Sequence, residues 1–191
     1  MPVFDDDFTF IHIPKSGGTS IEHFLVNQGC SMKLFTATGS VFINGHTPQH
    51  CTYRELADLN MLTNKIFTIL RPEVDRVISE YFYIKTHRPD LNAYFQTFEE
   101  FLDLFLNHEN RLMFDFHNLS NKEFLINLEG EISSDIQIIP FFDIPSIEAF
   151  LERDGLSYYH AFQTFRTEEI DGKSVARIQE YYEADYFCPH P

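Results

Sequence analysis

The stretch FTFIHIPKSGGTS, residues 8–20, decides the fold. Its first six residues are mostly apolar, as is typical of a short strand, and Pro14 ends that strand. Small residues follow, and a helix is expected to begin near Thr19. Glycine lets a backbone approach a ligand closely, and a helix N-terminus favours negative charge. The stretch therefore predicts an anion site between a strand and a helix.

The side chains of this loop supply further donors for an anion. A lysine adds a mobile positive charge, and hydroxyl groups can donate to non-bridging oxygens. The expected anion-binding residues of the loop are Lys15, Ser16, Gly17, Gly18, Thr19 and Ser20. A nucleoside triphosphate fits less well, because the pattern GxxxxGK[ST] needs glycine where this chain has Thr9 and Pro14. A glycine-rich turn without a ligand is the remaining alternative.

Composition limits the class of partner. The chain has 191 residues, enough for one domain with a substantial core, and 21 Phe without any Trp predict a core rich in phenylalanine. The 14 basic and 29 acidic residues give a formal net charge of −15. Nucleic acid, anionic membrane and long polyanions are therefore poor partners for the surface as a whole, since each requires a basic footprint.

The cysteines and the hydropathy of the sequence indicate in which cellular compartment the protein is expected. Cys30, Cys51 and Cys188 match no metal-binding spacing, so we expect free thiols and no metal. No signal peptide is visible, and no run approaches the roughly 20 apolar residues of a membrane span. We expect a soluble, cytoplasmic protein without membrane insertion.

A second strand and helix follow the pattern of the first. Residues 65–70, KIFTIL, are almost continuously apolar, as in a strand covered on both faces, and Arg71 and Pro72 end them. Apolar residues at helical spacing then begin at Val74. Two such units predict an α/β fold with a central, mainly parallel sheet flanked by helices and ligands at the carboxyl ends of its strands. No linker divides the chain, so residues 1–191 are expected to form one domain.

The remaining segments are predicted from local signals. Thr52 with Glu55 and Thr97 with Glu100 have capping-box spacing and predict helix starts. The other expected elements are two short strands within residues 33–43, a helix over about 53–60, a loop or lid over 84–96, two short helices within 108–130, a strand over 136–142, a helix opening at 145–146 and a last helix over about 174–184.

Two motifs carry a resemblance to a known family. FIHIPKSGGTS resembles the 5′-phosphosulfate loop of sulfotransferases that use 3′-phosphoadenosine-5′-phosphosulfate (PAPS), and most of all the carbohydrate branch with the heparan sulfate 2-O-sulfotransferases. LRPEVDRVISEYFY resembles the 3′-phosphate motif of the same family, RDPxxRxxSxY. The matching residues of the second motif are Arg71, Arg76, Ser79 and Tyr81. The departure is Pro72, one position earlier than in the family, and the alternative for Arg76 is a surface ion pair with Glu73 or Glu80.

The resemblance implies a three-layer, P-loop-like fold and sulfuryl transfer from PAPS to an acceptor hydroxyl. In that chemistry Lys15 would stabilise the leaving group, while Arg71, Arg76 and Ser79 would bind the 3′-phosphate. His46 in FINGHTP resembles the second histidine of an HGH element in the 2-O-sulfotransferases, whose first histidine is Asn44 here. The resemblance thus implies His46 as the base.

Other assignments stay open at this stage. His50 is the nearest rival to His46, and His12 is expected to be buried in the strand. Arg166 could close over the 3′-phosphate or lie on the surface. The acceptor, a carbohydrate or small molecule, has no signature; Tyr83, Tyr94 and Phe95 could stack on it or could equally belong to the core. A P-loop-like nucleotide kinase, a non-catalytic nucleotide-binding module and a trimmed Golgi-type domain are the alternatives to a soluble microbial or viral sulfotransferase.

Overall fold

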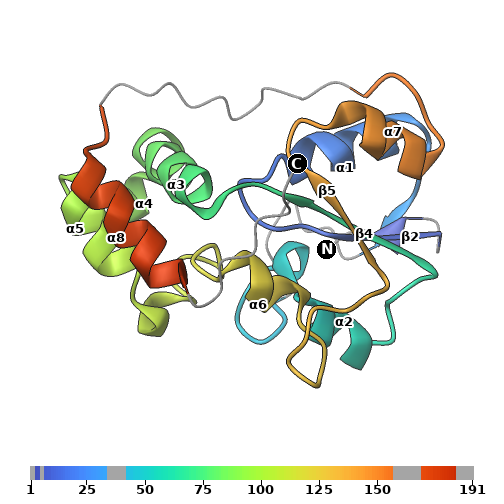
Figure 1. Cartoon of the computed structure of the whole chain (residues 1–191), viewed down its shortest axis with the longest axis horizontal. Helices are drawn as coiled ribbons and strands as arrows, with labels where there is room; N and C mark the ends of the chain where they lie inside the picture. The colour runs from blue at the N-terminus through green and yellow to red at the C-terminus, as the bar shows by residue number, and fades with distance from the viewer. Residues whose placement is uncertain (1–2, 5–6, 34–41, 157–168, 184–191) are drawn as a thin grey trace.

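The computed structural model describes residues 3–4, 7–33, 42–156 and 169–183 (Figure 1). Its described strands form one sheet in the order β3-β1-β2-β4-β5. These strands are β1 (Val3–Phe4), β2 (Phe8–Ile11), β3 (Met32–Lys33), β4 (Lys65–Leu70) and β5 (Ile136–Pro140). The strands β2, β4 and β5 run parallel, whereas β1 is antiparallel to both of its neighbours. The carboxyl ends of the three parallel strands therefore meet at one edge of the sheet.

Helices cover both faces of the parallel strands (Figure 1). On one face α1 (Gly18–Asn27) and α7 (Ile144–Leu151) pack against Phe10 and Phe67. On the other, α2 (Tyr53–Asp58) and α6 (Asn121–Leu125) pack against Ile11 and Ile66. Successive strand residues point to opposite faces, which explains why neighbours in β2 and β4 belong to different apolar clusters.

A separate group of helices lies beside the sheet, at the left of Figure 1. It consists of α3 (Glu73–His87), α4 (Pro89–Asn92), α5 (Phe98–Phe105) and α8 (Gly172–Tyr182). Their shared core is rich in phenylalanine, as composition predicts, and contains the fully buried rings of Tyr81, Phe101 and Phe105. Two 3₁₀ turns, η1 (Pro48–His50) and η2 (His108–Asn110), complete the described elements.

Several local predictions are confirmed. Both expected capping boxes are present, at Thr52 with Glu55 and at Thr97 with Glu100. A third, at Ser120 with Glu123, starts α6 and has the same spacing in the sequence. The α/β class with parallel strands flanked by helices is confirmed, and no described helix is long and apolar enough to cross a membrane.

Two local predictions are wrong. Residues 84–96 are not simply a loop, because α3 continues to His87 and α4 follows; the buried side chains of Ile84 and Leu91 extend the helical core beneath a polar surface. No strand forms at Ile43, which makes one bridge to His46. The chain turns sharply there, because Asn44 and Gly45 have positive φ angles of 50° and 91°.

Residues 34–41, Arg166 and Cys188 lie outside the described part of the chain. Within residues 108–130, the described helical elements are η2 and α6.

The capping box of α5 gives a stability prediction. Thr97→Ala removes the side-chain oxygen that accepts from the Glu100 N–H, so the free energy of unfolding should fall by about 1 kcal/mol in urea denaturation. Thr86→Ala, at an exposed position near the end of α3, is the matched control and should change it by less than about 0.5 kcal/mol. Equal losses in the two variants would contradict a specific capping effect.

Candidate functional site: an anion loop beside a cluster of histidines

The loop between β2 and α1 presents unpaired donors. Its residues Lys15, Ser16, Gly17 and Gly18 are called the anion loop below. Lys15 and Gly17 have positive φ angles of 62° and 80°, and this turn leads directly into α1. The backbone N–H groups of Gly17, Gly18 and Thr19 have no acceptor among the described residues. The hydroxyl of Ser16 is buried, with the residue 1% exposed, and also has no partner there. A buried polar group without a partner is costly, and an anion that accepted from these donors would remove that cost.

Glycine is required at position 18 by the ring of His12. A Cβ atom at Gly18 would lie only 2.3 Å from Cδ2 of His12. The ring is held in this place by Glu22, whose Oε1 is 2.5 Å from Nδ1 of His12, and Gln49 bridges the pair. His12 is buried, as the sequence predicts, but it lies against the anion loop and supports it.

Lys15 and Arg71 come together from adjacent strand ends. Nη1 of Arg71 donates to the carbonyl oxygen of Lys15 over 3.0 Å, and its guanidinium lies 4.9 Å from the ring centroid of Phe141. Nζ of Lys15 lies 3.8 Å from the ring centroid of Tyr83. Burial lowers the pKa of Lys15, Glu80 opposes that change, and Arg71 adds to it. An anion bound beside this ammonium group would favour its charged form.

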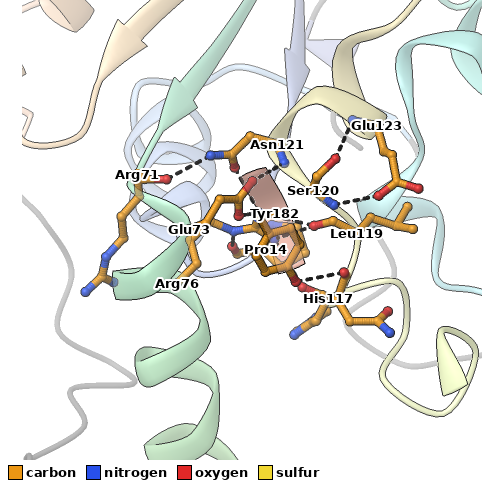
Figure 2. A network of polar contacts seen from close by, with 11 residues as sticks. Pro14, Arg71, Glu73, Arg76, His117, Leu119, Ser120, Asn121, Glu123 and Tyr182 are labelled. Carbon is orange, nitrogen blue, oxygen red and sulfur yellow. Dashed lines mark hydrogen bonds and ion pairs between the residues drawn. The ribbon is translucent and has the colours of Figure 1, made fainter. Parts of the chain in front are cut away.

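Arg76 is the centre of a buried network (Figure 2). Its Nε donates to the carbonyl oxygen of Pro14 over 3.0 Å. Its other donors reach Glu73, Asn121 and two carbonyl oxygens of the segment before α6. The network ties the start of the anion loop to α3 and α6.

Arg76 therefore has a different role from the expected one. All its N–H groups are directed at protein acceptors, so no donor is left for a 3′-phosphate. Its pairing with Glu73, over 2.7 Å, is the alternative considered from the sequence, but both side chains are buried instead of solvated. Ser79 lies half-buried three residues further along α3.

His46 is also enclosed by protein. Its residue is 0% exposed, and its ring stacks on Phe116 with 4.1 Å between ring centroids. Nδ1 lies 2.8 Å from the carbonyl oxygen of Thr47, and Nε2 lies 2.9 Å from Oε1 of Glu55. Each nitrogen faces a protein acceptor, so the geometry gives His46 no free lone pair for a substrate hydroxyl.

A cluster of histidines and carboxylates that was not predicted from the sequence lies next to the loop. Nδ1 of His50 is 2.9 Å from Oδ2 of Asp115, and the His50 ring centroid is 4.6 Å from that of His117. Nδ1 of His117 lies 2.9 Å from Oε2 of Glu80, although the pair is misaligned for a hydrogen bond. The spacing Asp-x-His at 115–117 was the available sequence signal, yet its partner His50 is 65 positions away.

The turn that presents Asp115 is strained. Asp115 and the next residue, Phe116, both have positive φ, 51° and 65°. Non-glycine residues in this region cost of order 1–3 kcal/mol each and persist where the surroundings hold them. Here Thr47 holds the carboxylate with its N–H and its hydroxyl, both over 2.7 Å. Such strain is common at functional sites. The turn places the carboxylate of Asp115 against the ring of His50.

Within the described part of the chain, two sets of side chains could hold a metal ion. One is His46, Cys51 and Glu55, and the other is His50, Asp115 and His117; in each set the ligand atoms lie within 4.8 Å of one another. Burial raises the pKa of Cys51 to about 12, which disfavours the thiolate that a metal needs. In the second set a metal would have to replace the proton between His50 and Asp115.

A cavity among the described residues lies elsewhere. It has a volume of about 510 Å³ and is lined by residues that include Asp7, Asn64, Lys65 and Glu152. These residues lie at the amino ends of β2 and β4 and at the end of α7, whereas the anion loop follows the carboxyl end of β2. The cavity is therefore at the opposite edge of the sheet from the histidine cluster.

The chain was compared with models of protein families, with curated proteins and with solved structures, and none of these comparisons finds a match.

Arg76 gives a test of the buried network. Arg76→Met leaves the carboxylate of Glu73 buried without its partner, so the free energy of unfolding should fall by roughly 3–5 kcal/mol. Arg177→Met removes an exposed pair with Asp103 and should cost less than about 1 kcal/mol. Denaturant unfolding of both variants is the measurement, and a loss for Arg76→Met no larger than for the control would contradict its structural role.

The lowered pKa of Glu55 predicts that the stability of the fold depends on pH. Burial alone would raise its pKa, but hydrogen bonds from His46, Thr52 and Asn44 outweigh burial and lower the pKa from 4.5 to about 2. The ionised carboxylate therefore stabilises the fold above pH 4.5, and this contribution is lost as pH falls toward 2.

The variant Glu55→Gln isolates the charge, because glutamine can keep the capping box. Its unfolding free energy should be lower than that of the wild type by roughly 2 kcal/mol at pH 7, and the difference should vanish near pH 2. Glu180→Gln, at an exposed position of α8, is the control. A difference that does not change between pH 7 and pH 2 would show that charge is not the cause.

Proposed function

We propose that this protein transfers a sulfuryl group from PAPS to the hydroxyl of a carbohydrate or small molecule. The finer description of the fold as three-layer and P-loop-like belongs to the same proposal. The observation that carries it is the buried Ser16 hydroxyl without a partner, next to the unpaired N–H groups of Gly17, Gly18 and Thr19. This arrangement supports binding of a tetrahedral anion with several oxygens, such as the 5′-phosphosulfate.

Lys15 suits the leaving group. When the bond between sulfur and the bridging oxygen breaks, negative charge develops on the 5′-phosphate, and a nearby ammonium group stabilises it. The side chain of Lys15 lies over Tyr83 and is partly desolvated, so its interaction with such a charge is stronger than at an open surface. The charged form that it needs would be favoured by the bound donor itself.

Arg71 is the residue that we assign to the 3′-phosphate. It follows β4, the strand next to β2, and one of its donors already touches the anion loop. Two anion sites at adjacent strand ends suit a nucleotide phosphorylated at both its 5′ and 3′ positions. Arg76 enters the proposal as the side chain that fixes this geometry, since its Nε holds the carbonyl oxygen of Pro14 at the start of the loop.

The donor class is tested by calorimetric titration with 3′-phosphoadenosine-5′-phosphate (PAP) in comparison with ATP. PAP should bind more tightly, and Ser16→Ala and Arg71→Ala should each weaken it by roughly 10-fold or more, as expected for loss of hydrogen bonds to a charged group. Ser31→Ala, outside the loop, is the control for Ser16→Ala.

Three results would overturn this assignment. PAP could fail to bind the wild-type protein, ATP with magnesium could bind more tightly and be turned over, or the loop variants could bind PAP as well as the control does. The second result would support a phosphotransferase.

A further inference from the structure

The pair His50 and Asp115 has the arrangement of a base with its orienting carboxylate. Burial alone would raise the pKa of Asp115, but the hydrogen bond and charge of His50, together with His117 and the Thr47 N–H, lower it. The carboxylate is therefore ionised and can only accept, so Nδ1 of His50 is the donor across their 2.9 Å contact. The lone pair of a neutral His50 then lies on Nε2, as in catalytic triads.

The ring of His12 lies between His50 and the anion loop. The ring centroid of His50 is 5.4 Å from that of His12, and the His12 ring fills the space that a Cβ atom of Gly18 would need. On its other side His50 contacts His117, which is paired with Glu80, and Glu80 interacts favourably with the charge of Lys15. Gly18 is thus separated from His50 by the ring of His12.

Among the histidines near the loop, His50 alone combines a fixed ring with a nitrogen that makes no hydrogen bond within the described residues. Both nitrogens of His46 face protein acceptors. His12 is packed directly onto Gly18. Nδ1 of His117 faces Glu80 in a contact that is misaligned for a hydrogen bond, so that carboxylate does not fix the ring of His117 as Asp115 fixes that of His50.

We propose that His50, oriented by Asp115, accepts the proton of the hydroxyl that receives the sulfuryl group; this rests on the proposed function. The acceptor oxygen forms a bond to sulfur while the bond from sulfur to the bridging phosphate oxygen breaks. The hydroxyl proton moves to Nε2 of His50, and the electron pair leaves with the 5′-phosphate of PAP beside Lys15. Asp115 is a positioning residue, because it holds the tautomer and stabilises the imidazolium that forms.

The charges around His50 make this role depend on the donor. Burial lowers the pKa of His50 to about 3, the hydrogen bond and charge of Asp115 oppose that change, and His117 and His12 add to it. Glu80 also faces this cluster from α3. The negative charge of a donor in the loop would oppose the effect of burial on the pKa of His50.

The first experiment observes the imidazole directly. Long-range ¹H–¹⁵N NMR of protein labelled at histidine would be recorded across pH with and without PAP, and the His50 signals would be assigned by their loss in His50→Gln. We expect the tautomer protonated at Nδ1, with ¹⁵N chemical shifts of His50 that change when PAP binds. A tautomer protonated at Nε2, or His50 signals that PAP does not shift, would overturn the proposal.

The second experiment measures release of PAP from PAPS with p-nitrophenol and methyl glycosides as acceptors. His50→Gln should lower kcat by about 10²- to 10⁴-fold with PAP affinity little changed, and Asp115→Asn should lower kcat and shift the acidic limb of the pH profile. His108→Gln, at an exposed turn, is the matched control. Near-normal turnover in His50→Gln would overturn the proposal, as would activity removed by EDTA and restored by Zn²⁺.

The outcomes separate this proposal from the one on which it rests. If the wild-type protein does not bind PAP, the proposed function fails and the role of His50 fails with it. If PAP binds but the His50 signals do not respond, only the assignment of the base fails. If none of the acceptors supports turnover, the NMR result alone decides whether His50 is assigned as the base.

Discussion

The rest of the structure depends on one buried cation, the guanidinium of Arg76. Its donors hold the carbonyl oxygen of Pro14, the carboxylate of Glu73 and the segment that leads into α6 (Figure 2). The desolvation of a buried charge is tolerated only when good hydrogen bonds compensate for it. The network therefore admits few alternative arrangements, and it fixes the position of the anion loop relative to the helices.

The sequence predicted the parts of the fold that depend on neighbouring residues. Strand, loop and helix at residues 8–27, the buried strand KIFTIL and the capping boxes all follow from local chemistry, and the structure has each of them. The expectation that ligands bind at the carboxyl ends of parallel strands agrees with the contact between Arg71 and Lys15, because β2 and β4 end at the same edge of the sheet. These predictions needed no knowledge of distant contacts.

The site residues were harder to predict, because their roles depend on partners far away in the chain. Arg76 and Ser79 share a helix face, yet only the contacts with Pro14 and with residues 117–121 show that Arg76 is structural. His46 and His50 look alike in sequence. They differ because Glu55 and Thr47 occupy both nitrogens of His46, whereas Asp115, on a strained turn, orients only one nitrogen of His50.

The contact between α8 and the segment before α6 has a consequence for how the protein is made. The hydroxyl of Tyr182 donates to the carbonyl oxygen of Asn118 over 2.9 Å, next to the segment that Arg76 holds. The network around the anion loop thus includes a residue that is translated long after the loop itself. During synthesis the loop emerges first but lacks this support until Tyr182 has left the ribosome, so the nascent chain acquires its finished site only after residue 182 has been added.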